Sequence, residues 1–120
     1  RKTIEVTSYA EVVLVPPAAD AMQRGFNNLF VHTEILGLRN AIVCTRRPRS
    51  AGEQPPWMLH VMKVRGGESV HTSYETDRMR FIGRGRTLAD PIALGESVQL
   101  SGSQGSVLAP LVAIRHRIVL

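Results

Sequence analysis

Residues 73–87, with the sequence SYETDRMRFIGRGRT, bring together two acids, four arginines, two aromatics and two glycines. Glu75 and Asp77 are two residues apart. A pair of carboxyl groups is what general acid and base chemistry on a glycosidic bond requires. Arginine guanidinium groups bind carboxylates and phosphates through paired hydrogen bonds. This run is therefore the first candidate for chemistry in the chain.

Ion pairing is the stronger expectation for the two carboxylates. On a strand, residues two apart share one face, about 6–7 Å apart at the backbone. Flanking cations such as Arg78, Arg80 and Arg84 favour the ionised carboxylate, whereas a general acid must hold its proton. We therefore expect no catalytic residue here. For Glu75 and Asp77 we predict structural ion pairs first and sugar hydroxyl binding second.

The same run also supplies a substrate-binding hypothesis. A tyrosine can stack on the C–H face of a sugar, although aromatics make up 5% of the chain and usually anchor the core of a small sandwich. Gly83 and Gly85 predict turns with positive φ rather than a phosphate cradle, because the Lys-Ser or Lys-Thr of a P-loop is missing. The candidate substrate-binding residues are Tyr74, Glu75, Asp77, Arg78, Arg84 and Arg86.

Composition predicts one folded domain. The 120 residues, 43% of them apolar, suffice for a single core, and no apolar run is long enough to span a membrane. The net charge of +5 invites a nucleic-acid partner, but acids interleave the basic cluster, so we expect none. The chain has no signal-peptide pattern. It opens with Arg1 rather than Met, which predicts a fragment of a longer protein or a processed chain.

Cys44 is the single cysteine, and its apolar neighbours predict a buried, inert thiol. One cysteine allows no disulfide within the chain, which fits a reducing compartment. The histidines have no spacing typical of a zinc site, so we expect no metal and no cofactor. They are His32, His60, His71 and His116.

Alternation of apolar and polar residues predicts an all-β fold, an antiparallel β-sandwich. A turn at Asn40 joins two of the strands in a hairpin. The strand at 57–64 is apolar on both faces, which favours a central position, and Pro16 ends the first strand. We expect strands at 3–15, 27–38, 41–45, 57–64, 70–75, 98–100 and from 111 onward, a helical turn at 18–25, and otherwise loops across 77–106.

Seven segments together resemble one family. They are 4–14 (IEVTSYAEVVL), 28–31 (NLFV), 45–48 (TRRP), 74–78 (YETDR), 81–87 (FIGRGRT), 100–102 (LSG) and 105–108 (GSVL). In this order they are similar to the N-terminal β-sandwich of inverting glycoside phosphorylases of the cellobiose and chitobiose phosphorylase type. The resemblance is strongest to the phosphorylase-like C-terminal region of cyclic β-1,2-glucan synthases. The chain has Ala109 where the family has an acid, so no polar role is expected at that position.

The resemblance implies a non-catalytic module with a supersandwich-like fold, and further strands of the full sandwich could lie outside this chain. In that family the sandwich precedes a catalytic (α/α) barrel, takes part in dimer contacts, and can approach the active site of the partner subunit. The partners implied are the barrel of the same parent chain, a second copy in a homodimer, and a β-glucan oligosaccharide contacted by residues 74–87. The parent would be a bacterial inner-membrane protein, with this segment outside the membrane on the cytoplasmic side; the alternative is a cytoplasmic protein.

Two other functions remain open from sequence. The chain could be a free-standing β-glucan-binding module, or a protein-interaction sandwich without sugar contact. An exposed Tyr74 ready to stack on a sugar favours the free-standing module. A buried Tyr74, with the arginines paired to carboxylates, favours either the non-catalytic module of a larger enzyme or the protein-interaction sandwich. A large exposed apolar patch indicates a missing neighbouring domain.

Overall fold

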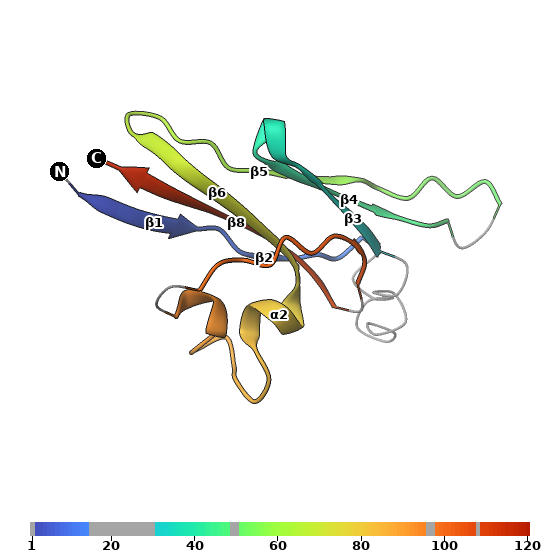
Figure 1. Cartoon of the computed structure of the whole chain (residues 1–120). Coiled ribbons are helices and arrows are strands. Elements are labelled where there is room, and N and C mark those ends of the chain that lie inside the picture. Colours follow the sequence, from blue (N-terminus) through green and yellow to red (C-terminus); the bar gives the residue numbers. More distant parts are fainter. Residues whose placement is uncertain (1, 15–30, 49–50, 96–97, 108) are drawn as a thin grey trace.

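The computed structural model describes residues 2–14, 31–48, 51–95, 98–107 and 109–120, which form two antiparallel sheets (Figure 1). The first sheet contains β1 (Thr3–Thr7), β2 (Ala10–Glu11), β6 (Glu68–Asp77) and β8 (Pro110–Val119). The second contains β3 (Val31–Leu36), β4 (Ala41–Arg46), β5 (Met58–Val61) and β7 (Gly105–Ser106). The short helices are η1 (Gly37–Arg39), α2 (Arg78–Ile82) and η2 (Ile92–Leu94). The predicted all-β sandwich is confirmed.

Strand β8 is the centre of the first sheet. It pairs with β6 along one side and with β1 and then β2 along the other. Val112 and Ile114 pack in the core between the sheets, while Leu111 and Ala113 pack on the opposite face under α2 and η2. Because both faces are covered, the strand is apolar at successive positions rather than at alternate ones.

Two apolar clusters hold the three layers together. The cluster between the sheets consists of Val12, Leu14, Val31, Ile42, Cys44, Val112 and Ile114. The cluster between the first sheet and the helical layer consists of Phe81, Ile82, Ala93, Leu100, Leu111 and Ala113. The ring of Tyr9 packs against Phe81 with 5.0 Å between ring centroids. The segment after β6 is therefore a covering layer with a core of its own.

The predicted strand 3–15 is wrong at its middle. Ser8 separates β1 from β2 because its hydroxyl oxygen accepts a hydrogen bond from the amide of Ile114 at 3.0 Å. A side chain thus takes the place of a backbone carbonyl in the ladder with β8, which interrupts the strand. Residues 12–14 are not strand either, although Val12 and Leu14 are buried.

Strand β5 lies at an edge, so the predicted central position is wrong. The order of the second sheet is β5-β4-β3-β7. The outward side chains of this part of the chain are apolar but exposed, at 76% for Trp57 and 61% for Leu59. Two-sided apolarity here reflects an uncovered sheet face rather than burial on both sides.

Some of the remaining strand predictions are confirmed and others are wrong. The hairpin of β3 and β4 is confirmed, with Leu36 paired to Ala41 and Asn40 in the left-handed region at φ 52°. Residues 98–100 are not a strand, and α2 and η2 interrupt the predicted loops. The helical turn expected at 18–25 lies outside the described residues. No helix in the described part of the chain has the length and apolarity to cross a membrane.

Cys44 provides a test of the core between the sheets. Its side chain is 0% exposed, as predicted, and burial raises the pKa of the thiol to about 11. We expect a thiol-reactive dye at pH 8 to label the native chain at least about a hundredfold more slowly than the urea-unfolded chain, because the thiolate is the reactive form. Equal rates in the two states would place Cys44 outside the core.

His60 links the two sheets and predicts a pH dependence. Its Nε2 lies 2.8 Å from the hydroxyl oxygen of Ser8, and burial lowers the pKa of its ring. Below pH about 6.5 the unfolded chain then binds more protons than the folded one, so stability falls as the pH drops. Urea unfolding from pH 7.5 to 5 should show a flatter profile for His60→Gln than for the unmodified chain. Equal slopes for His60→Gln and the unmodified chain would contradict this role of His60.

Candidate functional site

Glu75 is a buried carboxylate at the heart of the candidate run. It is 1% exposed and lies on the face of β6 toward the helical layer. The hydroxyl of Ser101 lies 2.7 and 2.9 Å from its two carboxylate oxygens. Backbone amides of Thr76, Asp77 and Ser101 donate to the same oxygens at 3.2–3.3 Å. Glu75 thus joins β6 to the chain returning toward β7, and the predicted ion pair with an arginine is wrong.

Asp77 ends β6 and begins α2. A register shift separates Glu75 from Asp77 in the ladder with β8, so the two carboxylates do not present a common face. Oδ1 of Asp77 accepts a hydrogen bond from the amide of Met79 at 2.9 Å, which caps the helix. Its Oδ2 lies 3.7 Å from Nε of Arg80, which confirms the predicted ion pairing for this residue.

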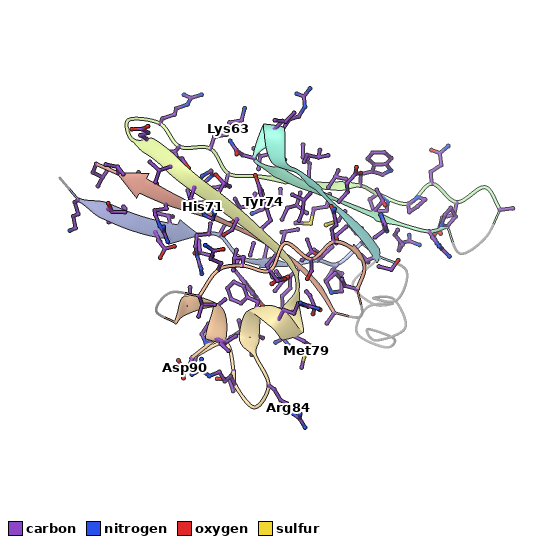
Figure 2. The ribbon with its side chains drawn as sticks, in the orientation of Figure 1. Lys63, His71, Tyr74, Met79, Arg84 and Asp90 are labelled. Atoms are coloured by element: carbon purple, nitrogen blue, oxygen red, sulfur yellow. The ribbon has the colours of Figure 1, made fainter. Side chains whose placement is uncertain are left out.

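Tyr74 packs against the core between the sheets. Its hydroxyl lies 3.3 Å from the carbonyl oxygen of Gly37 and 3.5 Å from Oδ1 of Asn40. Burial raises the pKa of this hydroxyl. A half-buried ring with a tethered hydroxyl is an anchor between β6 and η1 (Figure 2), rather than an open platform for a sugar.

The other arginines of the run, Arg78, Arg84 and Arg86, lie in three different places. Nε of Arg78 lies 2.6 Å from Glu11 on β2, and this hydrogen bond raises the pKa of Arg78. Arg86 lies 3.9 Å from Asp90 within the loop after α2. Arg84 is exposed at the far end of that loop (Figure 2). These positions do not converge on one ligand-sized site.

Gly83 allows the chain to turn sharply after α2. Its φ is 91°, and a Cβ atom there would lie 2.8 Å from a methyl carbon of Ile92. Both facts require glycine, so the predicted turn is confirmed. The turn folds the loop back so that η2 packs beside α2 over the first sheet.

Sequence reasoning missed Arg115, which is 5% exposed on β8. Its guanidinium donates to Thr7 Oγ1 and to the carbonyl oxygens of Val98 and Ala93, at 2.8, 2.8 and 2.5 Å. A charged residue at an inward position of the otherwise apolar strand β8 was the signal in the sequence that could have identified Arg115.

Sequence reasoning also missed a polar cavity of about 350 Å³ on the other side of the first sheet. The cavity is lined by Leu38, Asn40, Lys63, Val64, Gly67, Ser69, Thr72 and His116.

Comparison with known proteins identifies the family. The sequence model of one protein family, the supersandwich domain of glycosyl hydrolase 94, matches residues 1–120. The chain belongs to this family. The chain is also 42% identical over 113 residues to cyclic beta-(1,2)-glucan synthase NdvB of Rhizobium meliloti (strain 1021). The aligned part covers 94% of this chain and 4% of that relative. The resemblance in the sequence is therefore confirmed.

The two acids of the run 73–87, Glu75 and Asp77, have structural roles in this supersandwich domain. Glu75 is enclosed, and Asp77 caps a helix, so the run carries no exposed pair of carboxylates. Within the described residues no group of three His, Cys, Asp or Glu side chains could hold a metal ion.

Proposed function

We propose that this chain is a scaffold module of a larger bacterial carbohydrate-active enzyme, a cyclic β-1,2-glucan synthase or a related glycoside phosphorylase. The observation that carries this proposal is the 42% identity, over nearly the whole chain, to a small part of a glucan synthase. The chain packs on the catalytic (α/α) barrel of its parent and takes part in contacts between subunits of a homodimer. Its parent is an inner-membrane protein, and this segment lies on the cytoplasmic side.

The outer face of the second sheet suits the contact with the barrel. Leu59 and Val61 of β5 are exposed beside Trp57, and Leu38 of η1 is fully exposed at 104%. Contiguous exposed apolar side chains mark surfaces that a partner covers. Leu59 pairs with Val43 of β4, so the apolar surface extends across neighbouring strands. The exposed side chains of Leu38, Trp57, Leu59 and Val61 are called the apolar strip below.

The loop after α2, which carries Arg84 and Arg86, suits the contact between subunits. Arg84 lies at the end of the loop after α2, on the side of the molecule away from β5 (Figures 1 and 2), and both Arg84 and Arg86 are exposed. Exposed guanidinium groups form bidentate hydrogen bonds with carboxylates of a neighbouring chain or with acceptor oxygens of a bound ligand. From this loop the module reaches a glucan at the partner's active site through the exposed Arg84 and Arg86.

Association with the catalytic segment tests the proposal. The chain and the barrel-containing segment of the same gene are expressed separately, and their complex is measured by light scattering. We expect a 1:1 complex that Leu59→Asp weakens at least about tenfold, as for a residue central to an apolar interface. Leu88→Asp, an exposed leucine on the loop after α2, is the matched control. Absence of a complex, or equal loss with both variants, contradicts the proposed packing.

A further inference from the structure

The polar cavity lies where η1, the chain after β5 and the N-terminal half of β6 meet. Asn40 belongs to the η1 turn, Lys63 follows β5, Ser69 and Thr72 lie on β6, and His116 of β8 is at the floor. Figure 2 shows Lys63 on the side of the molecule away from Arg84. The volume of about 350 Å³ is within the range of about 300–1,000 Å³ found for small-molecule sites.

Hydrogen bonds at the floor leave one hydroxyl proton for a ligand. His116 is 1% exposed, and its Nε2 lies 2.6 Å from the carbonyl oxygen of Met62, so Nε2 carries a proton. Nδ1 is a single hydrogen-bonding position, yet Ser69 Oγ at 2.8 Å and Thr72 Oγ1 at 3.1 Å both approach it. At most one of the two hydroxyls donates to Nδ1. The other lies 3.4 Å from the first, a long contact, and can donate into the cavity.

The rim and walls add complementary chemistry. Lys63 brings three ammonium donors and Asn40 brings an amide, while the hydroxyl oxygens of Ser69 and Thr72 keep lone pairs that accept. Leu38 and Val64 give the cavity apolar surface, and no carboxylate is among the described residues that line it. A pyranose ring presents hydroxyl donors, hydroxyl acceptors and apolar C–H groups together. A small anion would use the donors but leave the apolar walls unfilled.

We propose that this cavity is a binding site for one glucose unit of a β-glucan, contacted by Ser69, Thr72 and Lys63. The choice of glucan rests on the proposed function, whereas the class of polyhydroxylated ligand rests on the cavity. The site is separate from residues 74–87 and shares only the anchor that Tyr74 forms with Asn40. A glucan strand held here lies beside the apolar strip through Leu38, next to the surface proposed for the barrel.

Nuclear magnetic resonance of the full chain tests the site. The isotope-labelled chain is titrated with the β-1,2-linked disaccharide of glucose, with cellobiose, and with inorganic phosphate. We expect the β-glucosides to shift the amides of residues 38–40 and 63–72 and leave those of residues 84–86 unchanged. Thr72→Val, which keeps shape and removes the hydroxyl, should weaken binding about tenfold, the effect of losing one or two hydrogen bonds. Lys63→Met should weaken it similarly.

Thr45→Val on β4 is the matched control, since it makes the same change on another strand away from the cavity. Unfolding midpoints of all variants establish that each is folded. No shift at the solubility limit of the sugars, unchanged binding by Thr72→Val, or displacement of the sugar by phosphate overturns the site. A chain that joins the barrel segment but fails this titration refutes the cavity alone. A chain that binds sugar here without joining the barrel segment refutes the scaffold alone.

Discussion

Glu75→Ala is expected to lower the free energy of unfolding by about 3 kcal/mol. The carboxylate is 1% exposed and accepts hydrogen bonds from the Ser101 hydroxyl and from three backbone amides. A hydrogen bond to a charged group contributes about 1.5–3 kcal/mol, and removal of the acceptor leaves buried donors without a partner. Urea unfolding at neutral pH, with the slope against denaturant held as a check on two-state behaviour, measures the loss.

Three further variants make the Glu75 result specific. Glu34→Ala removes an exposed carboxylate from β3 and should change stability by less than about 0.5 kcal/mol. Glu75→Gln keeps the shape but turns one acceptor into a donor that faces N–H groups, so most of the loss should remain. Ser101→Ala combined with Glu75→Ala should cost little more than Glu75→Ala alone, because the two side chains share one network. Strict additivity of the two losses would contradict this role of Glu75.

Local patterns predicted the parts of the fold that local geometry determines. The hairpin of β3 and β4 follows from alternation on both sides of Asn40, a residue that tolerates the left-handed backbone at its turn. The helix α2 was missed because its five residues depend on the Asp77 cap and on burial of Phe81 and Ile82 against β8. Burial of this kind is a tertiary effect that no short window of sequence contains.

The candidate site shows the same limit more sharply. Neighbouring arginines in the sequence suggested ion pairs for Glu75, whereas its actual partner, Ser101, is 26 residues away along the chain. The role of Asp77 was nearer the prediction, since both its helix cap and its contact with Arg80 lie within three residues. Side chains that meet across four segments, as around His116, have no spacing that a sequence pattern could reveal.

Arg115→Met is expected to lower the free energy of unfolding by about 3 kcal/mol. Comparison with a variant of the exposed Arg117 then separates the effect of a buried cation from that of an exposed one on the same strand. Arg115 is 5% exposed and donates to the carbonyl oxygens of Ala93 and Val98 and to the hydroxyl of Thr7. Its removal leaves the buried carbonyl group of Ala93 and the partly buried one of Val98 without this donor, and it loosens η2 from the first sheet. Urea unfolding gives the loss, and hydrogen exchange at the Gly95 amide, which donates to Ile92, reports the loosening.

Arg117→Met is the matched control for Arg115. Arg117 lies two residues further along β8, about half-exposed, with its guanidinium 3.9 Å from Glu5. Exposed ion pairs contribute about 0–1 kcal/mol, so this variant should be nearly neutral and leave exchange at Gly95 unchanged. Arg115→Lys keeps the charge but not the planar fork that reaches three acceptors, and should recover less than half of the loss. If Arg115→Met and Arg117→Met cost the same, charge on β8 rather than the anchoring of η2 decides stability.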